Sequence, residues 1–198
     1  QFTPFNEFYD TRAYAYGIEF LLKKTAGKIR GWIGYTFAET NRHIKKHGWY
    51  QPKYDRTHTL NIVGDLELRK DVHFSTSLQT SSGQPFTPPV GRYEQWYADH
   101  KAYGTNWFYN QGFLVDDKNS ARLSPYFRLD VGLKQDKTFF GRPYQRFLQL
   151  VNVTNHINPL THQYRNKTNR LTGETLGLQR AEVPMFPFFL TMGLRVEF

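Results

Sequence analysis

Residues 188–198 read FFLTMGLRVEF, and this stretch decides the fold. Counting back from the last residue, every second position is apolar: Phe198, Val196, Leu194, Met192, Leu190 and Phe188. The positions between them include Glu197 and Arg195. Because successive side chains of a β-strand point to opposite faces, this alternation predicts a strand with one apolar and one polar face. An edge strand of a soluble sheet shows the same pattern, so the rest of the chain must separate the two cases.

The same alternation recurs upstream. It predicts strands over residues 13–24, 28–39, 56–69, 72–80 and 125–135, and a less regular one over 146–154. Charged residues fall on the less apolar face strand after strand: Arg30, Asp65, Glu67, Arg128, Asp130, Lys134 and Arg195. In a membrane barrel the outer face must exclude charge, because Lys or Arg at mid-bilayer costs roughly 2–4 kcal/mol there. The consistent sorting of charge favours a barrel over a soluble sandwich.

The connections differ in length. Short turns are expected at 25–27 and 70–71 and a connection near 136–145, whereas 40–54, 83–122 and 156–184 are long and polar. Long structureless loops are uncommon in compact soluble domains but normal on the extracellular side of an outer-membrane barrel. The sequence therefore predicts an all-β fold, an antiparallel transmembrane β-barrel segment of about seven strands.

An odd strand count has two consequences. Bacterial single-chain barrels have an even number of strands, so we expect the missing ones elsewhere in the same parent protein. The two ends of the chain should also lie on opposite sides of the membrane, with Phe198 in the periplasm and Gln1 near the outer surface. We therefore expect residues 1–198 to be the C-terminal portion of a transmembrane barrel domain, in a multi-pass protein of the bacterial outer membrane.

Composition narrows the function. The chain has no cysteine, so disulfides, thiolate metal sites and a Cys nucleophile are excluded. The net charge is +9, but the basic residues are spread rather than clustered, which does not favour nucleic-acid binding. No apolar run approaches the ~18 residues of a transmembrane helix. Basic loops either meet anionic lipid headgroups or are simply solvated.

No catalytic, metal or cofactor motif is present. HExxH, GxSxG and P-loop patterns are missing, so we do not expect an enzyme or a cofactor. His43 and His47 have metal-ligand spacing for a helix but lie in an expected loop, and His58 is better explained by a structural hydrogen bond. Asn152 and Asn155 are expected to organise a turn through side-chain to backbone bonds.

The 83–122 segment is rich in aromatic residues. Rings at Trp96, Tyr97, Tyr103, Trp107, Phe108 and Tyr109 could stack on a sugar, chelate or peptide ligand. The alternative is that they pack the loops together or form an outer aromatic girdle. We favour the second interpretation, because the sequence of one part of a barrel wall does not reveal a substrate pocket.

Ordered phrases along the chain resemble TonB-dependent receptors of the kind that carry a carboxypeptidase-regulatory-like N-terminal extension. The phrases are 17–20 (GIEF), 34–37 (GYTF), 54–61 (YDRTHTLN), 82–87 (SGQPFT), 128–131 (RLDV) and 152–155 (NVTN), with Phe198 at the end. The terminal Phe resembles the C-terminal signal that the barrel assembly machinery recognises in outer-membrane barrels. The expected signal comprises Phe198 and the alternating apolar residues before it, Val196, Leu194, Met192 and Leu190. A small structural or adhesive outer-membrane barrel is the alternative.

The resemblance implies a barrel of about 22 strands around a plug, with nutrient uptake driven by TonB. Neither the plug domain nor a TonB box is found in residues 1–198, so this uptake is expected of the parent protein. Expected partners are outer-membrane lipid and lipopolysaccharide, the remainder of the barrel with its plug, the assembly machinery and TonB, the last through the parent protein. A surface lipoprotein is a further candidate partner. No nucleic acid and no metal are expected.

Overall fold

A computed structural model describes residues 10–101, 104–169, 171–172 and 175–196. Within these ranges the chain is all-β and antiparallel, with fourteen strands. No helix in the described part of the chain is long and apolar enough to cross a membrane. The all-β, antiparallel part of the sequence prediction is confirmed.

Seven long strands form one sheet in the order β1-β2-β4-β5-β10-β11-β14. We call these seven strands the wall; the short β3 (Gly48–Tyr50) pairs with β2 beside it. Every neighbouring pair is antiparallel. The bounds are β1 Thr11–Lys24, β2 Ile29–Ile44, β4 His58–Arg69, β5 Val72–Ser81, β10 Tyr126–Phe139, β11 Arg142–Val151 and β14 Phe189–Val196.

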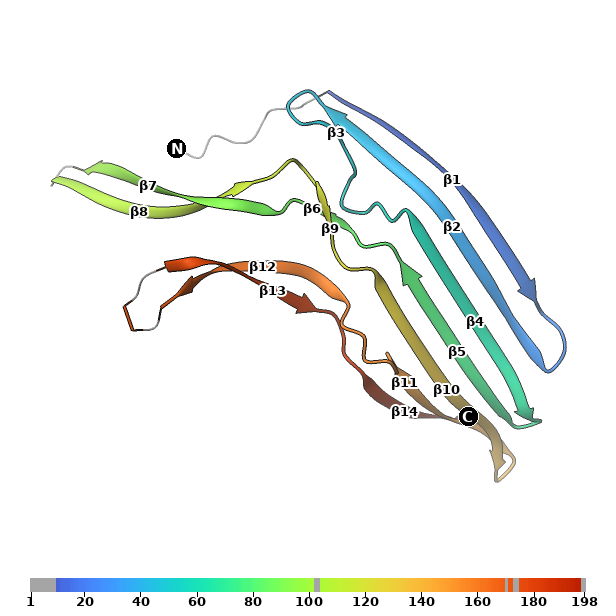
Figure 1. Ribbon diagram of the computed structural model, residues 1–198. Coiled ribbons are helices and arrows are strands. Elements are labelled where there is room, and N and C mark those ends of the chain that lie inside the picture. Colours follow the sequence, from blue (N-terminus) through green and yellow to red (C-terminus); the bar gives the residue numbers. More distant parts are fainter. Residues whose placement is uncertain (1–9, 102–103, 170, 173–174, 197–198) are drawn as a thin grey trace.

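The connections sort by length to opposite ends of the wall (Figure 1). Residues 25–28, 70–71 and 140–141 close tight turns at one end, where Gly27 and Gly141 supply the positive φ that such turns need. The long connections leave the other end, which we call the rim. Thr11, where β1 begins, lies at the rim, and Val196, where β14 ends, lies at the turn end.

Two of the long connections form hairpins of their own. Their strands are β7 (Pro89–Lys101) with β8 (Gly104–Val115), and β12 (Pro159–Thr168) with β13 (Thr175–Pro184). The pair β6 (Pro85–Phe86) and β9 (Ala121–Arg122) joins the first hairpin to the wall. Figure 1 shows both hairpins reaching away from the wall toward the same side.

Sequence and structure differ at the connections. The segments 40–54, 83–122 and 156–184, expected as loops, carry strand structure, and β2 continues to Ile44. The connection expected near 136–145 is wrong in extent: β10 and β11 run on as a hairpin that turns at 140–141. These stretches pair backbone to backbone without an apolar face, so periodicity gave no signal there.

The wall has no hydrophobic core. Among the described residues the buried apolar side chains are Leu123 and Val151, at 8% and 4% exposure, and three prolines, Pro52, Pro85 and Pro159. Leu194 is 65% exposed, and Leu60 and Phe127 are only partly covered. The sheets do not close into a barrel, and β1 and β14 stand at the two edges of the wall.

Candidate functional site: a two-faced wall and its rim

One face of the wall is apolar across all seven strands. Directly opposed residues of antiparallel neighbours share a face, so the register assigns each side chain. Ile33, Ile62, Leu78 and Leu129 form one row across β2, β4, β5 and β10. We call this side the apolar face. Its other members include Ile18, Phe20, Leu22, Leu60, Leu66, Phe74, Val131, Leu133, Leu148, Leu150, Leu190, Met192, Leu194 and Val196.

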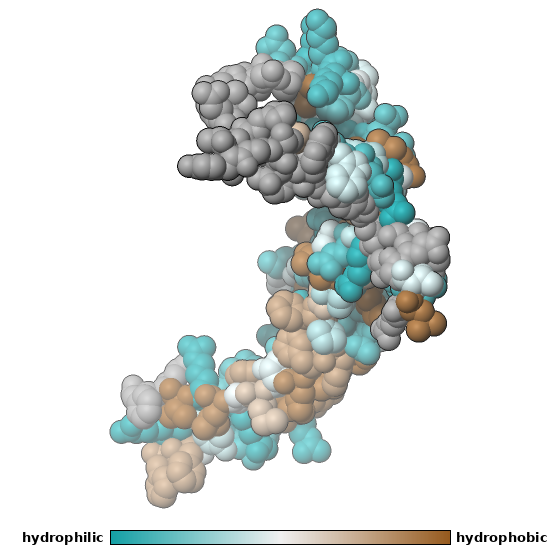
Figure 2. Space-filling model, turned by 90° about the vertical axis from the view of Figure 1, so that its left-hand side faces the viewer, coloured by the Kyte–Doolittle hydropathy of each residue, from teal (hydrophilic) through white to brown (hydrophobic). Residues whose placement is uncertain are grey.

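Hydrophobic side chains are therefore exposed in bulk rather than singly. In Figure 2 the hydrophobic colours gather over the lower half of the molecule, and hydrophilic side chains dominate its upper end. Exposed fractions reach 74% at Ile18 and 69% at Met192. Soluble monomers rarely expose an apolar patch that runs across a whole sheet.

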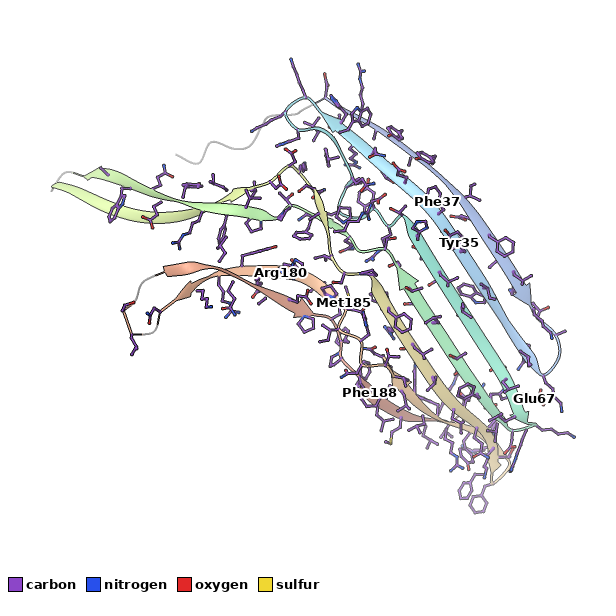
Figure 3. The ribbon with its side chains drawn as sticks, in the orientation of Figure 1. Tyr35, Phe37, Glu67, Arg180, Met185 and Phe188 are labelled. Atoms are coloured by element: carbon purple, nitrogen blue, oxygen red, sulfur yellow. The ribbon has the colours of Figure 1, made fainter. Side chains whose placement is uncertain are left out.

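Aromatic and histidine side chains border the apolar face toward the rim. The ring centroids of Tyr14 and Trp49 are 5.2 Å apart, and Tyr35 Oη and His58 Nδ1 are 2.8 Å apart. Figure 3 labels Tyr35 and Phe37, which lie on the same strand of this border. Rings with an apolar body and a polar tip suit a membrane–water boundary. The expected structural hydrogen bond of His58 is confirmed.

The opposite face, which we call the polar face, carries the charges. All seven charged residues predicted to share the less apolar side do so by register. Arg30 Nη2 lies 2.7 Å from Asp65 Oδ1, and His73 Nδ1 lies 3.4 Å from the same oxygen. These neighbours on adjacent strands neutralise one another without any apolar cover.

A buried carboxylate organises the rim between β2 and β9. The Asp55 side chain is 1% exposed and accepts hydrogen bonds from the Thr40 amide at 2.9 Å and from Arg122 Nη2 at 2.6 Å. Arg122 also donates to the Gln51 side chain, to Thr57 Oγ1 and to the Gly83 carbonyl oxygen. We call this cluster the Asp55 node.

The Asp55 node joins two of the phrases that carry the family resemblance. Residues 54–61 supply Asp55 and Thr57, while 82–87 supply Gly83. A Cβ on Gly83 would lie 1.7 Å from the Leu123 carbonyl oxygen, so only glycine allows this backbone approach. The node fixes the base of the β7–β8 hairpin to the wall.

A second cluster, the Asn152 node, holds the base of the β12–β13 hairpin. Asp130 Oδ1 accepts a hydrogen bond from the backbone N–H of Asn152 at 2.9 Å. The Arg128 guanidinium donates three hydrogen bonds to the same carboxylate. The Asn152 side chain donates to the His156 and Phe186 carbonyl oxygens. Here too, resemblance phrases that are far apart in sequence, 128–131 and 152–155, meet in space.

The predicted role of the asparagine pair is confirmed. Asn152 and Asn155 adopt positive φ values of 52° and 49°, a region that asparagine tolerates better than most residues. Asn155 Oδ1 accepts from the Phe188 amide at 3.0 Å, just before β14 begins. The Asn158 side chain similarly accepts a hydrogen bond from the Phe127 backbone N–H and donates one to the Phe127 carbonyl oxygen. These side chains replace backbone partners where the chain leaves the sheet.

The base of the β12–β13 hairpin contacts β6, the short strand that leads into the β7–β8 hairpin. The Phe86 and His162 rings pack edge to face with centroids 4.8 Å apart, and His162 is close to Glu182 of β13, at 3.4 Å. Figure 3 places Arg180 on this hairpin and Met185 just after it. The Met185 amide donates to the Asn158 carbonyl oxygen at 2.8 Å, which ties the hairpin's exit to the wall.

The predicted ligand-contacting aromatic residues map to the β7–β8 hairpin. Its register pairs Trp96 with Tyr109 and Tyr97 with Phe108, and Trp96 is 62% exposed. Tyr103 lies outside the described residues, as do the side chains of Tyr97, Trp107, Phe108 and Tyr109. Whether these rings meet a ligand stays a prediction.

The predicted assembly signal occupies β14. Leu190, Met192, Leu194 and Val196 all lie on the apolar face, in register with β11, and Phe198 lies outside the described residues. No group of three or more His, Cys, Asp or Glu that could hold a metal ion occurs among the described residues. His43 is a strand residue whose ring lies 5.1 Å from the Trp49 ring at an interplanar angle of 57°, and it is not part of a helical ligand pair.

Comparisons of the chain with protein-family models, with curated proteins and with solved structures give no match.

Sequence reasoning missed the contribution of Arg122. It lies in a stretch expected to be loop, 67 positions from Asp55. An isolated arginine in a polar segment has no periodic signal, so only the fold reveals its partner.

Proposed function

We propose that this chain is the C-terminal part of the β-barrel of a TonB-dependent outer-membrane receptor and takes part in nutrient transport. The observation that carries the proposal is the apolar face. It spans all seven strands of the wall and is exposed, while only a few apolar side chains of the described chain are buried. A lipid environment is the solvent in which such a face is favourable.

The dimensions of the apolar face agree with a bilayer. In β2 the pattern runs from Ile29 to Phe37, roughly 27 Å of strand at ~3.4 Å per residue. Strands of outer-membrane barrels tilt by about 40°, which leaves roughly 20 Å along the membrane normal. The aromatic border from Tyr14 to Trp49 extends this toward the ~25 Å apolar band expected of such barrels.

The polar face and the free edges support a larger barrel. Facing a wet lumen, the Arg30–Asp65 and Arg128–Asp130 pairs keep access to water or to a plug. The edges at β1 and β14 would leave backbone groups without partners in hydrocarbon, so we assign their pairing to the remainder of the same barrel. The rim, with its two hairpins, is then extracellular, and the turn end is periplasmic.

The test uses the full-length parent in its own host. Membrane fractionation should place the protein in the outer membrane with heat-modifiable mobility on gels. If the parent transports a nutrient through TonB, deleting its gene and inactivating TonB should abolish growth on the same compound from a panel of glycans, chelates and peptides. Recovery in the soluble fraction would refute the membrane assignment, and growth unaffected by either deletion on every compound would refute transport.

A further inference from the structure

A shallow groove lies on the apolar face close to the turn end, over β10, β11 and β14. Its volume is ≈ 590 Å³. Apolar side chains dominate its lining, with one charge among them: Leu133, Leu148, Met192, Leu194, Gln135 and Arg146, with Phe147 and Gly193 between them in the two last strands. The one guanidinium in the lining of this groove is the feature to explain.

Arg146 lies on the apolar face by register. It is opposite Gln135 in β10 and opposite Leu194 in β14. Gln135 is in turn opposite Val72, the first residue of β5, so Arg146 lies level with the tight turn at 70–71. A basic side chain on the lipid side at this height costs about 0–1 kcal/mol, far less than at mid-bilayer.

The guanidinium is held in place by a neutral partner. Arg146 donates from Nε, at 2.8 Å, and from Nη2 to the side-chain oxygen of Gln135. Gln135 Nε2 in turn donates to Asp71 Oδ2 at 2.7 Å. That bond lowers the pKa of the Asp71 carboxyl, so the turn keeps a fixed acceptor for Gln135. Within this chain of hydrogen bonds the direct partner of Arg146 is a neutral amide oxygen, so the guanidinium is oriented but its positive charge is not paired with a carboxylate there.

Further basic residues share this face and this end. Arg69 is opposite Val72, Lys137 is opposite Tyr144, and Arg142 is opposite Phe139, which places all three on the apolar side near the turns. The Asp71 carboxylate lies among them, since the charges of Lys137 and Arg69 help to lower its pKa. This border therefore carries both signs of charge, and Arg146 is the basic residue within the groove itself.

We propose that the groove binds one anionic phospholipid of the periplasmic leaflet, with its phosphate on Arg146 and an acyl chain along Leu133, Leu148 and Met192. This inference rests on the proposed function. Arg suits the role because its planar donors match two phosphate oxygens at once, while its stem packs on apolar side chains. The Gln135 bond presets the guanidinium and leaves other N–H donors for the phosphate.

The experiment places a reporter in the groove of the full-length parent. A parent freed of other cysteines, with Met192→Cys labelled with bimane, is reconstituted in phosphatidylcholine vesicles. Phosphatidylglycerol or phosphatidylcholine brominated in the acyl chains is then titrated in. The ratio of the two quenching isotherms gives the local preference for the anionic lipid.

We expect phosphatidylglycerol to be preferred at this position by about fivefold, the factor that one basic side chain gives at an anionic surface. Arg146→Gln should bring the preference close to one, and Gln135→Leu should lower it in part, since the guanidinium loses its anchor. Lys23→Gln, which removes a positive charge from the polar face near the same end, should leave it unchanged.

The outcomes separate this inference from the proposed function. Equal quenching by both lipids in the unmodified protein, or a preference that survives Arg146→Gln, would overturn the phospholipid site and leave the barrel proposal intact. No quenching by either lipid would contradict the lipid-facing wall itself and, with it, both proposals.

Discussion

Removing Arg122 should release the β7–β8 hairpin from the rim. Arg122 Nη2 donates to Asp55 Oδ2 at 2.6 Å, and the Asp55 side chain is 1% exposed. An Arg122→Leu variant leaves that carboxylate with the Thr40 amide at 2.9 Å and the Thr57 hydroxyl at 3.4 Å. Breaking a buried pair from one side costs about 3–5 kcal/mol. Because the Arg122 side chain is itself 31% exposed, we take the lower end of that range.

A local cost of about 3 kcal/mol raises the population of the opened hairpin base roughly a hundredfold. The assay is limited proteolysis of the reconstituted parent, with cleavage followed inside residues 84–121. The matched control is Arg56→Leu, because Arg56 donates only to neutral acceptors, Ser81 Oγ at 2.9 Å and the Ser82 carbonyl oxygen at 3.2 Å.

The control should accelerate cleavage by less than about tenfold, the factor for roughly 1.4 kcal/mol, which is the upper end of the net worth of a neutral hydrogen bond. If Arg122→Leu is cleaved no faster than Arg56→Leu, the Asp55 node does not hold the hairpin and the reasoning fails.

Four further outcomes are expected. Ile62→Arg should lower the free energy of unfolding of the membrane-embedded parent by roughly 2–4 kcal/mol, measured by urea titration. The control Asn61→Arg, one residue away on the polar face, should change that free energy little. Equal effects of the two variants would contradict the assignment of faces. Gly83→Ala should lower the yield of heat-modifiable protein, because its Cβ would lie 1.7 Å from a backbone carbonyl oxygen. Asn152→Ala should speed cleavage within the β12–β13 hairpin about tenfold or more, because the backbone carbonyl oxygens of His156 and Phe186 lose the side-chain donor that holds them. Replacing Phe198 with serine should reduce outer-membrane insertion, and unchanged mobility and yield would count against an assembly role.

The sequence predicted the wall well because successive side chains of a strand point to opposite faces, so two faces of different polarity produce a period of two. The expected strand over 72–80 matches β5, and the turn at 70–71 lies where the pattern required it. The assignment of residues to the two faces was also correct. Alternation alone placed Arg30 and Asp65 on the same face, and in the structure Arg30 Nη2 lies 2.7 Å from Asp65 Oδ1.

The rim could not be predicted in the same way. The outer part of β2 is polar, yet it pairs with β1 through backbone bonds, and Tyr16 Oη donates to Glu39 Oε2 at 2.7 Å. Both nodes depend on partners far apart in sequence, such as Asp130 and Asn152, 22 positions apart. The local backbone role of Asn152 and Asn155 was predicted correctly from their residue type. For a lone residue such as Arg122, no sequence pattern indicates which distant residue it will contact.

The sidedness of the wall is tested most directly by a nitroxide scan along β5. Each residue from His73 to Thr80 of the full-length parent is replaced in turn by a spin-labelled cysteine, and collision with oxygen, which concentrates in lipid, is compared with collision with a water-soluble nickel chelate. We predict that oxygen access peaks at positions 74, 76, 78 and 80 and chelate access at the positions between, with a period of two. A flat profile, or chelate access at Leu78 equal to that at Gln79, would contradict the account.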